Sequence, residues 1–122
     1  MNRPSSHRAA VAGAPLADRL AVADTHWTRL RGLLGTQALP EGDGLWIRPC
    51  RQVHMFGMRY PIDVVFVDDA QRVVGLTSDL QPGRVSPKFA GATSVLELPA
   101  GTIARTGLAL GTQLEIADGA AA

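Results

Sequence analysis

Three side chains that can bind soft metals stand four residues apart in the middle of the chain: Cys50, His54 and Met58. Thiolate, imidazole and thioether are ligands that copper and zinc sites use. On an extended strand, four residues span about 13 Å, a gap that metal–ligand bonds of about 2 Å cannot bridge. The three side chains converge only if the backbone loops, which Gly57 and the flanking prolines permit. A soft-metal (copper or zinc) site at these three residues is therefore one alternative.

The same cysteine and histidine could form a nucleophilic pair, with Asp63 as the acid that orients the imidazole. Such a pair needs hydrogen-bond contact and a lowered thiol pKa. The spacing assures neither condition, and the chain carries no local signature of a cysteine hydrolase. We therefore assign no catalytic residue and no cofactor, and we expect a binding protein in preference to an enzyme.

Arginine supplies the interpretation that we prefer for this region. Positions 29 to 59 hold five arginines but only two carboxylates, namely Arg29, Arg31, Arg48, Arg51 and Arg59 against Glu41 and Asp43. Guanidinium groups bind planar anions such as carboxylate and phosphate. We therefore predict that a small anion or a partner's carboxylate binds at a surface formed by Arg29, Arg31, Cys50, His54, Met58, Arg59 and Asp63. The remaining alternative is a purely structural or protein-interaction module.

Three other side chains carry expectations that a structure can test. Asp63 stands between Ile62 and Val64 in an apolar run, so its carboxylate needs a partner. An adjacent arginine, such as Arg59, or His54 is expected to supply one. The two tryptophans, Trp27 and Trp46, are expected to anchor the core.

Size and charge limit the classes of function. A chain of 122 residues indicates one domain, and its net charge of +1 gives no reason to expect nucleic acid or an anionic membrane as a partner. The single cysteine, Cys50, cannot form an internal disulfide and suits a reducing compartment, so a cytoplasmic location is predicted. No segment approaches the roughly 20 apolar residues of a membrane-spanning helix.

These side chains must be positioned by short elements. A single domain is predicted over residues 15–118, between a disordered leader (1–14) and a disordered tail (119–122). Helix signals appear at 24–35, where Asp24 or Thr25 can cap and Gly35 can end the helix, and at 102–107, capped by Thr102 and ended by Gly107. Apolar and alternating runs predict six strands, at 16–23, 44–48, 62–68, 72–80, 93–100 and 112–117. The predicted fold is mainly β (α+β), a small barrel-like curled sheet of about six short strands with two short helices.

The C-terminal segment 97–116 resembles the half-motif of swapped-hairpin transcription regulators of the AbrB type. Its charged side chains are Glu97, Arg105 and Glu115, which leave a net negative charge. DNA binding depends on positive charge that neutralises phosphates. We therefore interpret the likeness as shared local packing and do not predict a nucleic-acid partner.

Three longer segments, RLRGLLG, GLWIRPCRQVHMFGMRYPIDVVFVD and VLELPAGTIARTGLALGTQLEI, resemble in that order the bacterial and archaeal domain-of-unknown-function family 192. The likeness covers residues 16–117. It implies a single compact β-rich domain of roughly a hundred residues, and it transfers no catalytic role. By position, the family pattern matches Arg31, Gly32, Gly35, Cys50, His54, Met58, Arg59, Pro61, Ile62, Asp63, Glu97, Leu98, Gly101 and Gly107.

Overall fold

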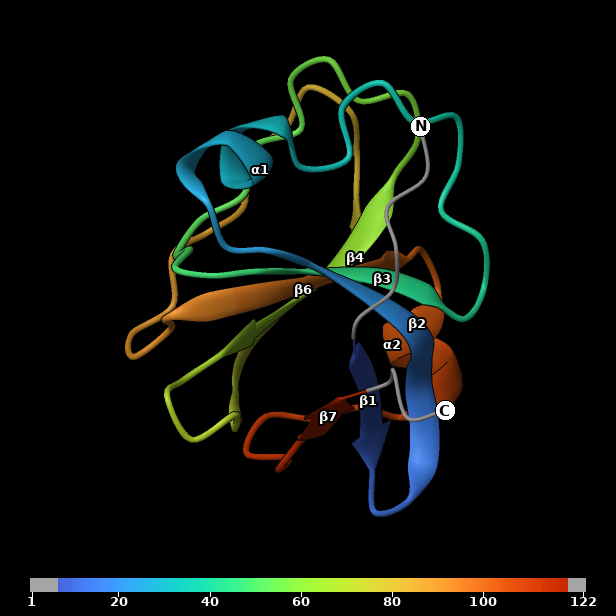
Figure 1. The fold of residues 1–122 in the computed structure, drawn as a ribbon, viewed down its shortest axis with the longest axis vertical. Helices are drawn as coiled ribbons and strands as arrows, with labels where there is room; N and C mark the ends of the chain where they lie inside the picture. The colour runs from blue at the N-terminus through green and yellow to red at the C-terminus, as the bar shows by residue number, and fades with distance from the viewer. Residues whose placement is uncertain (1–6, 119–122) are drawn as a thin grey trace.

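The strands of the protein form one sheet that curls on itself (Figure 1). The structure, a computed structural model, describes residues 7–118. The sheet order is β5-β4-β6-β3-β2-β1-β7. The strands are β1 (His7–Val11), β2 (Ala14–Ala23), β3 (Asp43–Ile47), β4 (Ile62–Val67), β5 (Val73–Leu80), β6 (Ser94–Pro99) and β7 (Glu115–Asp118); the helices are α1 (His26–Arg31) and α2 (Thr102–Thr106).

This architecture confirms the predicted fold class, with one strand more than the sequence indicates. The predicted leader, residues 1–14, contains β1, which pairs with both β2 and β7. The prediction of disorder is therefore wrong for residues 7–14, and Ala9 is buried in the core. The strand reads HRAAV, so its apolar residues are only Ala9, Ala10 and Val11, and they give too short an apolar run for a sequence pattern to detect. Residues 1–6 and the predicted tail, 119–122, lie outside the described residues.

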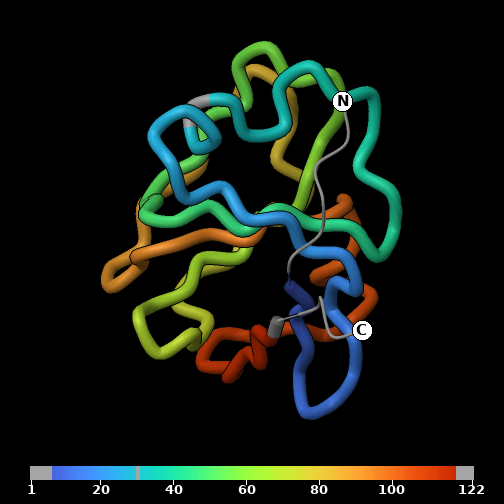
Figure 2. The backbone as a smooth tube through the Cα atoms, in the orientation of Figure 1, coloured from blue at the N-terminus to red at the C-terminus, as the bar shows by residue number. Residues whose placement is uncertain are grey.

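The position of α1 follows from the one parallel pairing among the named strands, between β2 and β3. Parallel neighbours need a crossover connection of a dozen or more residues. The connection 24–42 supplies it and carries α1 over one face of the sheet. In Figure 1 α1 lies at the top left with the long loops, whereas α2 lies at the lower right; α2 contacts β5. Figure 2 follows the same path along the backbone.

Helix α1 is shorter than its sequence pattern predicts. Thr25 and Thr28 form a reciprocal capping box, with both backbone-to-hydroxyl distances at 3.0 Å. The helix ends at Arg31, and Gly32, at φ 52°, closes it three residues before the predicted stop. Trp27 is 70% exposed, so its prediction as a core anchor is wrong; Leu33, beyond the helix, is buried instead. No helix within residues 7–118 has the length and apolar character to cross a bilayer.

The central strands β4 and β6 are buried on both faces. Successive side chains of a strand point to opposite faces, so each strand feeds two separate apolar clusters. The cluster that includes Leu33 takes Ile62, Val64 and Phe66 of β4 and Val95 of β6. The cluster that includes Ile103 of α2 takes Val65 and Val67 of β4, Leu96 and Leu98 of β6, and Trp46 of β3. Trp46 is 5% exposed, which confirms its role as a core anchor.

Asp63 belongs to the α2 face, and its carboxylate joins three elements. Asp63 is 0% exposed. Its Oδ1 accepts from the backbone N–H of Asp79 at 2.9 Å, and its Oδ2 accepts from that of Ile103 at 2.8 Å. The expected partner, an arginine or His54, is therefore wrong. Because α2 has no side-chain cap of its own, the buried carboxylate satisfies one of the orphan donors in its first turn.

The capping prediction for α2 is also corrected. Gly101, at φ 95°, is the N-cap residue, and Thr102 is the first helical residue. The Thr102 hydroxyl donates to the carbonyl of Pro99 at 2.7 Å instead of capping the helix. Gly107 ends α2 as predicted, with its N–H donating to the Ile103 carbonyl.

Two sets of contacts hold the curled sheet and its long loops. Backbone bonds from Val73 to Thr112 and from Leu114 to Gln71, both 2.9 Å, join the start of β5 to the segment that leads into β7. The loop 81–93 is fastened to the sheet by Phe89. A β-carbon added at Gly75 of β5 would lie 2.2 Å from Cγ of Phe89, so the ring lies directly against the bare backbone. Phe89 also packs on Phe66, with ring centroids 4.7 Å apart.

The buried carboxylate gives a first prediction. Asp63→Asn replaces an acceptor oxygen with an amide group and should lower the free energy of unfolding by about 2–3 kcal/mol, the scale of hydrogen bonds to charged groups. Asp69→Asn, at an exposed carboxylate, is the matched control and should change it by less than about 0.5 kcal/mol. Urea unfolding measures both. Equal effects would show that Asp63 does not support α2.

Candidate functional site

A cavity of about 380 Å³ is lined by α1 and the residues that follow it, by Ile47 of β3, by most of the segment 49–58 and by Glu97 of β6. Five of the seven predicted ligand-binding residues line it: Arg29, Arg31, Cys50, His54 and Met58. Arg59 is exposed and Asp63 is buried against α2, and neither belongs to the lining. The cavity therefore brings most of the predicted surface together and leaves two of its members elsewhere.

A turn at Gly57 brings the far end of this segment back to the cavity. Gly57 has φ +82°, a conformation that residues with a side chain rarely adopt. The N–H of Met58 donates back to the carbonyl of Met55 at 3.2 Å. A β-carbon at Gly57 would lie 3.2 Å from Cδ2 of Leu34, so the turn packs closely under the chain that follows α1.

The loop 81–93 fixes the other side of the segment. The N–H of Cys50 donates to the Thr93 carbonyl at 2.9 Å. Val53 exchanges two bonds with Ser86: its N–H donates to the serine Oγ at 2.9 Å, and the serine N–H donates to its carbonyl at 2.8 Å. His54 forms an isolated β-bridge with Val85. These bonds hold the backbone of 50–54, while the His54 ring stays exposed and stacks on Phe56 at 5.2 Å.

Arg29 enters the cavity lining from α1. It lies three residues after His26, so the two side chains share one side of the helix, and both line the cavity. Arg29 Nη1 donates to the Pro49 carbonyl at 3.3 Å. Its Nε is buried and has no hydrogen-bond partner among the described residues. A buried charged donor without a partner is costly, so an acceptor oxygen from water or from a bound group would stabilise this atom.

Cys50 and Glu97 give the inner part of the cavity its electrostatic character. Glu97 of β6 is 5% exposed, and it projects from the same face of the sheet as Val95. Burial raises the pKa of the Cys50 thiol above its usual 9.0; the charge of Glu97 raises it further, while the backbone of Gln52 and the charge of Arg29 act in the opposite direction. The thiol is therefore protonated at neutral pH and is not an activated nucleophile.

The catalytic alternative of Cys50, His54 and Asp63 is wrong in its third member. Asp63 projects to the face of the sheet that α2 covers, and both its carboxylate oxygens accept backbone N–H groups there. It cannot orient His54, which lines the cavity on the other face. The geometry leaves a thiol and an imidazole in one cavity without an orienting acid from β4.

The soft-metal alternative stays a prediction. Its three ligands, Cys50, His54 and Met58, do line one cavity. Among residues 7–118, no group of three His, Cys, Asp or Glu side chains could hold a metal ion. A protonated thiol and neighbouring guanidinium groups both disfavour a cation at this place.

The five arginines between positions 29 and 59 do not all line this cavity. Arg48 lies 3.8 Å from Asp24 and stacks on Trp46 at 4.1 Å, and it lines a second cavity. With Arg59 also outside, the arginines of the candidate site are Arg29, Arg31 and Arg51. We refer to this cavity, with these three arginines, as the arginine cavity.

Several lining residues are missed by the sequence reasoning, namely His26, Arg51, Gln52 and Glu97 as members of the site. Glu97 had a usable signal, because it is an acid between two leucines of an apolar strand. That is the same signal that singles out Asp63.

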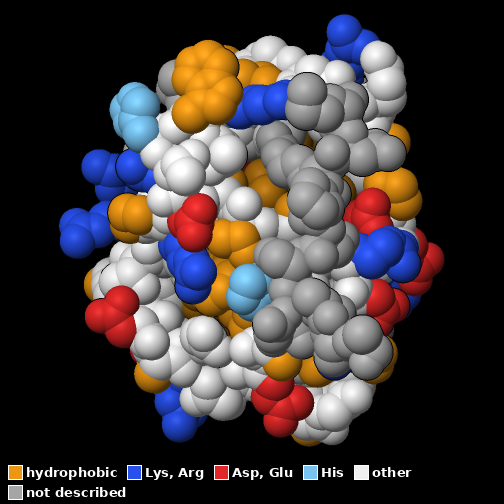
Figure 3. All heavy atoms as spheres, viewed as in Figure 1, with side chains coloured by type: hydrophobic (Ala, Val, Ile, Leu, Met, Phe, Trp, Pro, Cys, Tyr) orange, Lys and Arg blue, Asp and Glu red, His pale blue; other side chains and the backbone are white. Residues whose placement is uncertain are grey.

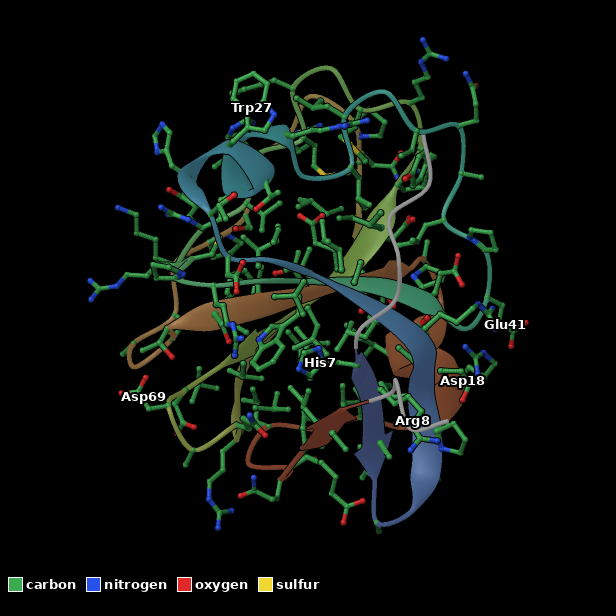
Figure 4. All side chains as sticks on the ribbon, viewed as in Figure 1. His7, Arg8, Asp18, Trp27, Glu41 and Asp69 are labelled. Carbon is green, nitrogen blue, oxygen red and sulfur yellow. The ribbon has the colours of Figure 1, made fainter. Side chains whose placement is uncertain are left out.

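The exposed Trp27 stands at the top of α1 in Figure 4, where Figure 3 shows a hydrophobic side chain beside a basic one.

The Gly57 turn gives a prediction with an internal control. Gly57→Ala and Gly83→Ala both place a side chain at positive φ, +82° and +81°, which costs about 1–2 kcal/mol of folding free energy. Gly57→Ala should cost more, because its β-carbon also crowds Leu34, whereas nothing lies within 4 Å at Gly83. Urea unfolding measures the difference. An equal or larger loss for Gly83→Ala would contradict the close packing of the turn.

The charges around Cys50 predict shifts of opposite sign. Only the thiolate attacks iodoacetamide, so the pH at half-maximal alkylation rate reports the thiol pKa. That midpoint should lie above 9.0. Glu97→Gln removes a negative charge and should lower it, Arg29→Gln removes a positive charge and should raise it, and Asp69→Asn should leave it unchanged. If Glu97→Gln and Arg29→Gln shift the alkylation midpoint in the same direction, the assigned effects of these two charges on the Cys50 thiol are wrong.

Known proteins resemble this chain over most of its length. A UPF0127 protein of Thermococcus sibiricus is 31% identical over 102 residues, which cover 80% of this chain and 65% of that one, so the chain spans less than two thirds of this relative's length. A crystal structure of a protein of unknown function from Novosphingobium aromaticivorans matches with a TM-score of 0.78 at 22% identity, over 90% of this chain and 83% of that one.

A second crystal structure, described as a candidate transcription regulator from Sinorhizobium meliloti, matches with a TM-score of 0.74 at 20% identity, over 94% of this chain and 96% of that one. At these identities both structures share the fold with this chain, and nothing further follows from them. The profile of the family described as "Uncharacterized ACR" matches residues 8–116. The chain therefore belongs to domain-of-unknown-function family 192, as its three sequence segments indicate.

Proposed function

We propose that the protein binds a small anion in the arginine cavity. The single observation that carries the proposal is the Nε of Arg29, a buried charged donor without a partner in the part of the chain that the structure describes. A carboxylate or phosphate oxygen is the group that best satisfies such a donor. The Pro49 carbonyl holds the other side of the guanidinium at 3.3 Å, so the group is positioned before a ligand arrives.

The balance of charge in the cavity supports an anion. Arg29, Arg31 and Arg51 face one carboxylate, that of Glu97, among the lining residues. His26 and His54 add ring nitrogens that can donate hydrogen bonds to an anion. The volume of about 380 Å³ lies near the lower end of the roughly 300–1,000 Å³ of ligand pockets. A ligand of metabolite size, or the end of a partner chain, therefore fits the proposal.

The proposal assigns ligand contact to Arg29, Arg31 and Arg51, with Cys50, His54 and Met58 as further lining. It omits Arg59 and Asp63, which lie outside the cavity. It keeps a binding role in preference to catalysis, since the Cys50 thiol is protonated and Asp63 is committed to α2. A cytoplasmic location is part of the proposal, because a lone thiol suits a reducing compartment.

Anion binding can be tested with two matched arginine substitutions. Arg29→Gln removes the charge and the orphan donor from the cavity, and Arg59→Gln removes the same charge from an exposed site outside it. Isothermal titration at low salt with phosphate and with short carboxylates gives the dissociation constants. Arg29→Gln should weaken the tightest interaction by about tenfold or more, the equivalent of about 1.5–3 kcal/mol for a charged hydrogen bond.

Arg59→Gln should leave the same dissociation constant within about twofold, the effect of a screened surface charge. Equal weakening by both substitutions would indicate a diffuse charge effect and not a site. Binding that survives Arg29→Gln unchanged, or a natural chain that binds no anion in the series, would overturn the proposal.

A further inference from the structure

The lining of the arginine cavity divides into an outer basic part and an inner apolar part. On the outer side, His26, Arg51 and His54 are exposed, and Arg29 and Arg31 are half-buried. The inner side is formed by buried apolar side chains, which are Leu33, Ile47, Val53 and Met55. The half-buried Leu34 and Met58 connect the two parts. A ligand that fills the cavity must therefore present a charged group to one side and an apolar surface to the other.

The inner part also contains an acid. Glu97 is buried and projects from β6, whose backbone is paired on both sides with β3 and β4. Its negative charge at the inner end opposes any second negative charge brought deep into the cavity. A compact, doubly charged anion such as phosphate is thus disfavoured near Glu97, and it offers no apolar surface to the inner lining.

We infer that the ligand is an amphipathic monocarboxylate, whose carboxylate binds Arg29 and whose apolar tail lies against Leu34, Met58 and the inner apolar lining. This inference rests on the proposed anion binding and names its ligand class. Two sources share the chemistry: a free organic acid with a short hydrocarbon or aromatic tail, and the C-terminal carboxylate of a polypeptide that ends in an apolar residue. Each would bury apolar surface that phosphate or acetate lacks.

A homologous series of acids measures the contribution of the tail. Acetate, butanoate and hexanoate carry the same head group, so differences in their dissociation constants report on the tail alone. Each methylene that enters the inner part should tighten binding by about fourfold, the equivalent of about 0.8 kcal/mol. Hexanoate should therefore bind more tightly than both acetate and inorganic phosphate at the same low ionic strength.

Two further ligands distinguish the sources. An N-acetylated tetrapeptide that ends in leucine carries the same chemistry as a polypeptide terminus, and its C-terminal amide is its uncharged control. If the peptide acid binds more tightly than hexanoate and the peptide amide does not bind, the ligand is a polypeptide terminus. Tighter binding of hexanoate would assign it to a free acid.

Substitution of the apolar lining tests where the tail lies. Leu34→Ser and Met58→Gln should each flatten the gradient from acetate to hexanoate, because each replaces apolar surface in the lining with a polar group. Leu110→Ser, at a residue that is exposed and outside the cavity, should leave the gradient intact. Thermal unfolding shows whether each variant is folded. If one variant does not fold, the gradient of dissociation constants in the natural chain still tests the inference.

The outcomes separate this inference from the proposal beneath it. If phosphate or acetate binds as tightly as hexanoate, and Arg29→Gln still abolishes that binding, the anion site stands and the amphipathic ligand is wrong. If Leu34→Ser, Met58→Gln and Leu110→Ser all leave the gradient unchanged, the tail does not lie on the inner lining. If no acid and no phosphate binds the natural chain, both the anion site and its ligand class fall together.

Discussion

The burial of β4 and β6 on both faces is the constraint from which the rest of the structure follows. Because their side chains alternate between two apolar clusters, a polar residue in either strand is directed to one of two different environments. Asp63 falls on the α2 face and holds that helix. Glu97 falls on the other face and lines the arginine cavity. Two acids with the same local sequence pattern thus become a structural clamp and part of a candidate binding site.

Most of the fold could be predicted from sequence because most of its strands carry strong apolar runs. The β4–β5 hairpin and β6 are examples, with buried residues throughout or in alternation. The failures have physical reasons. Strand β1 has only a short apolar run, and it is held by pairing on both edges, which no local pattern reveals. Trp27 is exposed in the first turn of α1, and Leu33, beyond the end of the helix, is buried in the core instead.

The candidate site could be predicted only in part, because a cavity depends on neighbours that are distant in sequence. Gly57 and the flanking prolines allow the backbone to turn, which predicts that Cys50, His54 and Met58 can line one site. Arg29 and Glu97 line the same cavity for two reasons. The β2–β3 crossover carries α1 over one face of the sheet, and the Glu97 side chain of β6 points to that same face. Local sequence does not predict the face of the sheet to which Asp63 or Glu97 points. That face depends on the order of the strands in the sheet and on which alternate residues of each strand point to each face.

The contact between Phe89 and the bare backbone of Gly75 has a consequence for how this site can evolve. Phe89 anchors the loop whose Ser86 and Arg84 hold the backbone of Val53 and Met55 at the cavity. Position 75 lies on β5, which ends the sheet order, and it does not line the cavity. Any side chain there would nevertheless displace the Phe89 ring and, through the loop, the wall of the arginine cavity. A redesign of the proposed anion site is thus free to change the lining residues, provided that glycine is kept at this remote strand position.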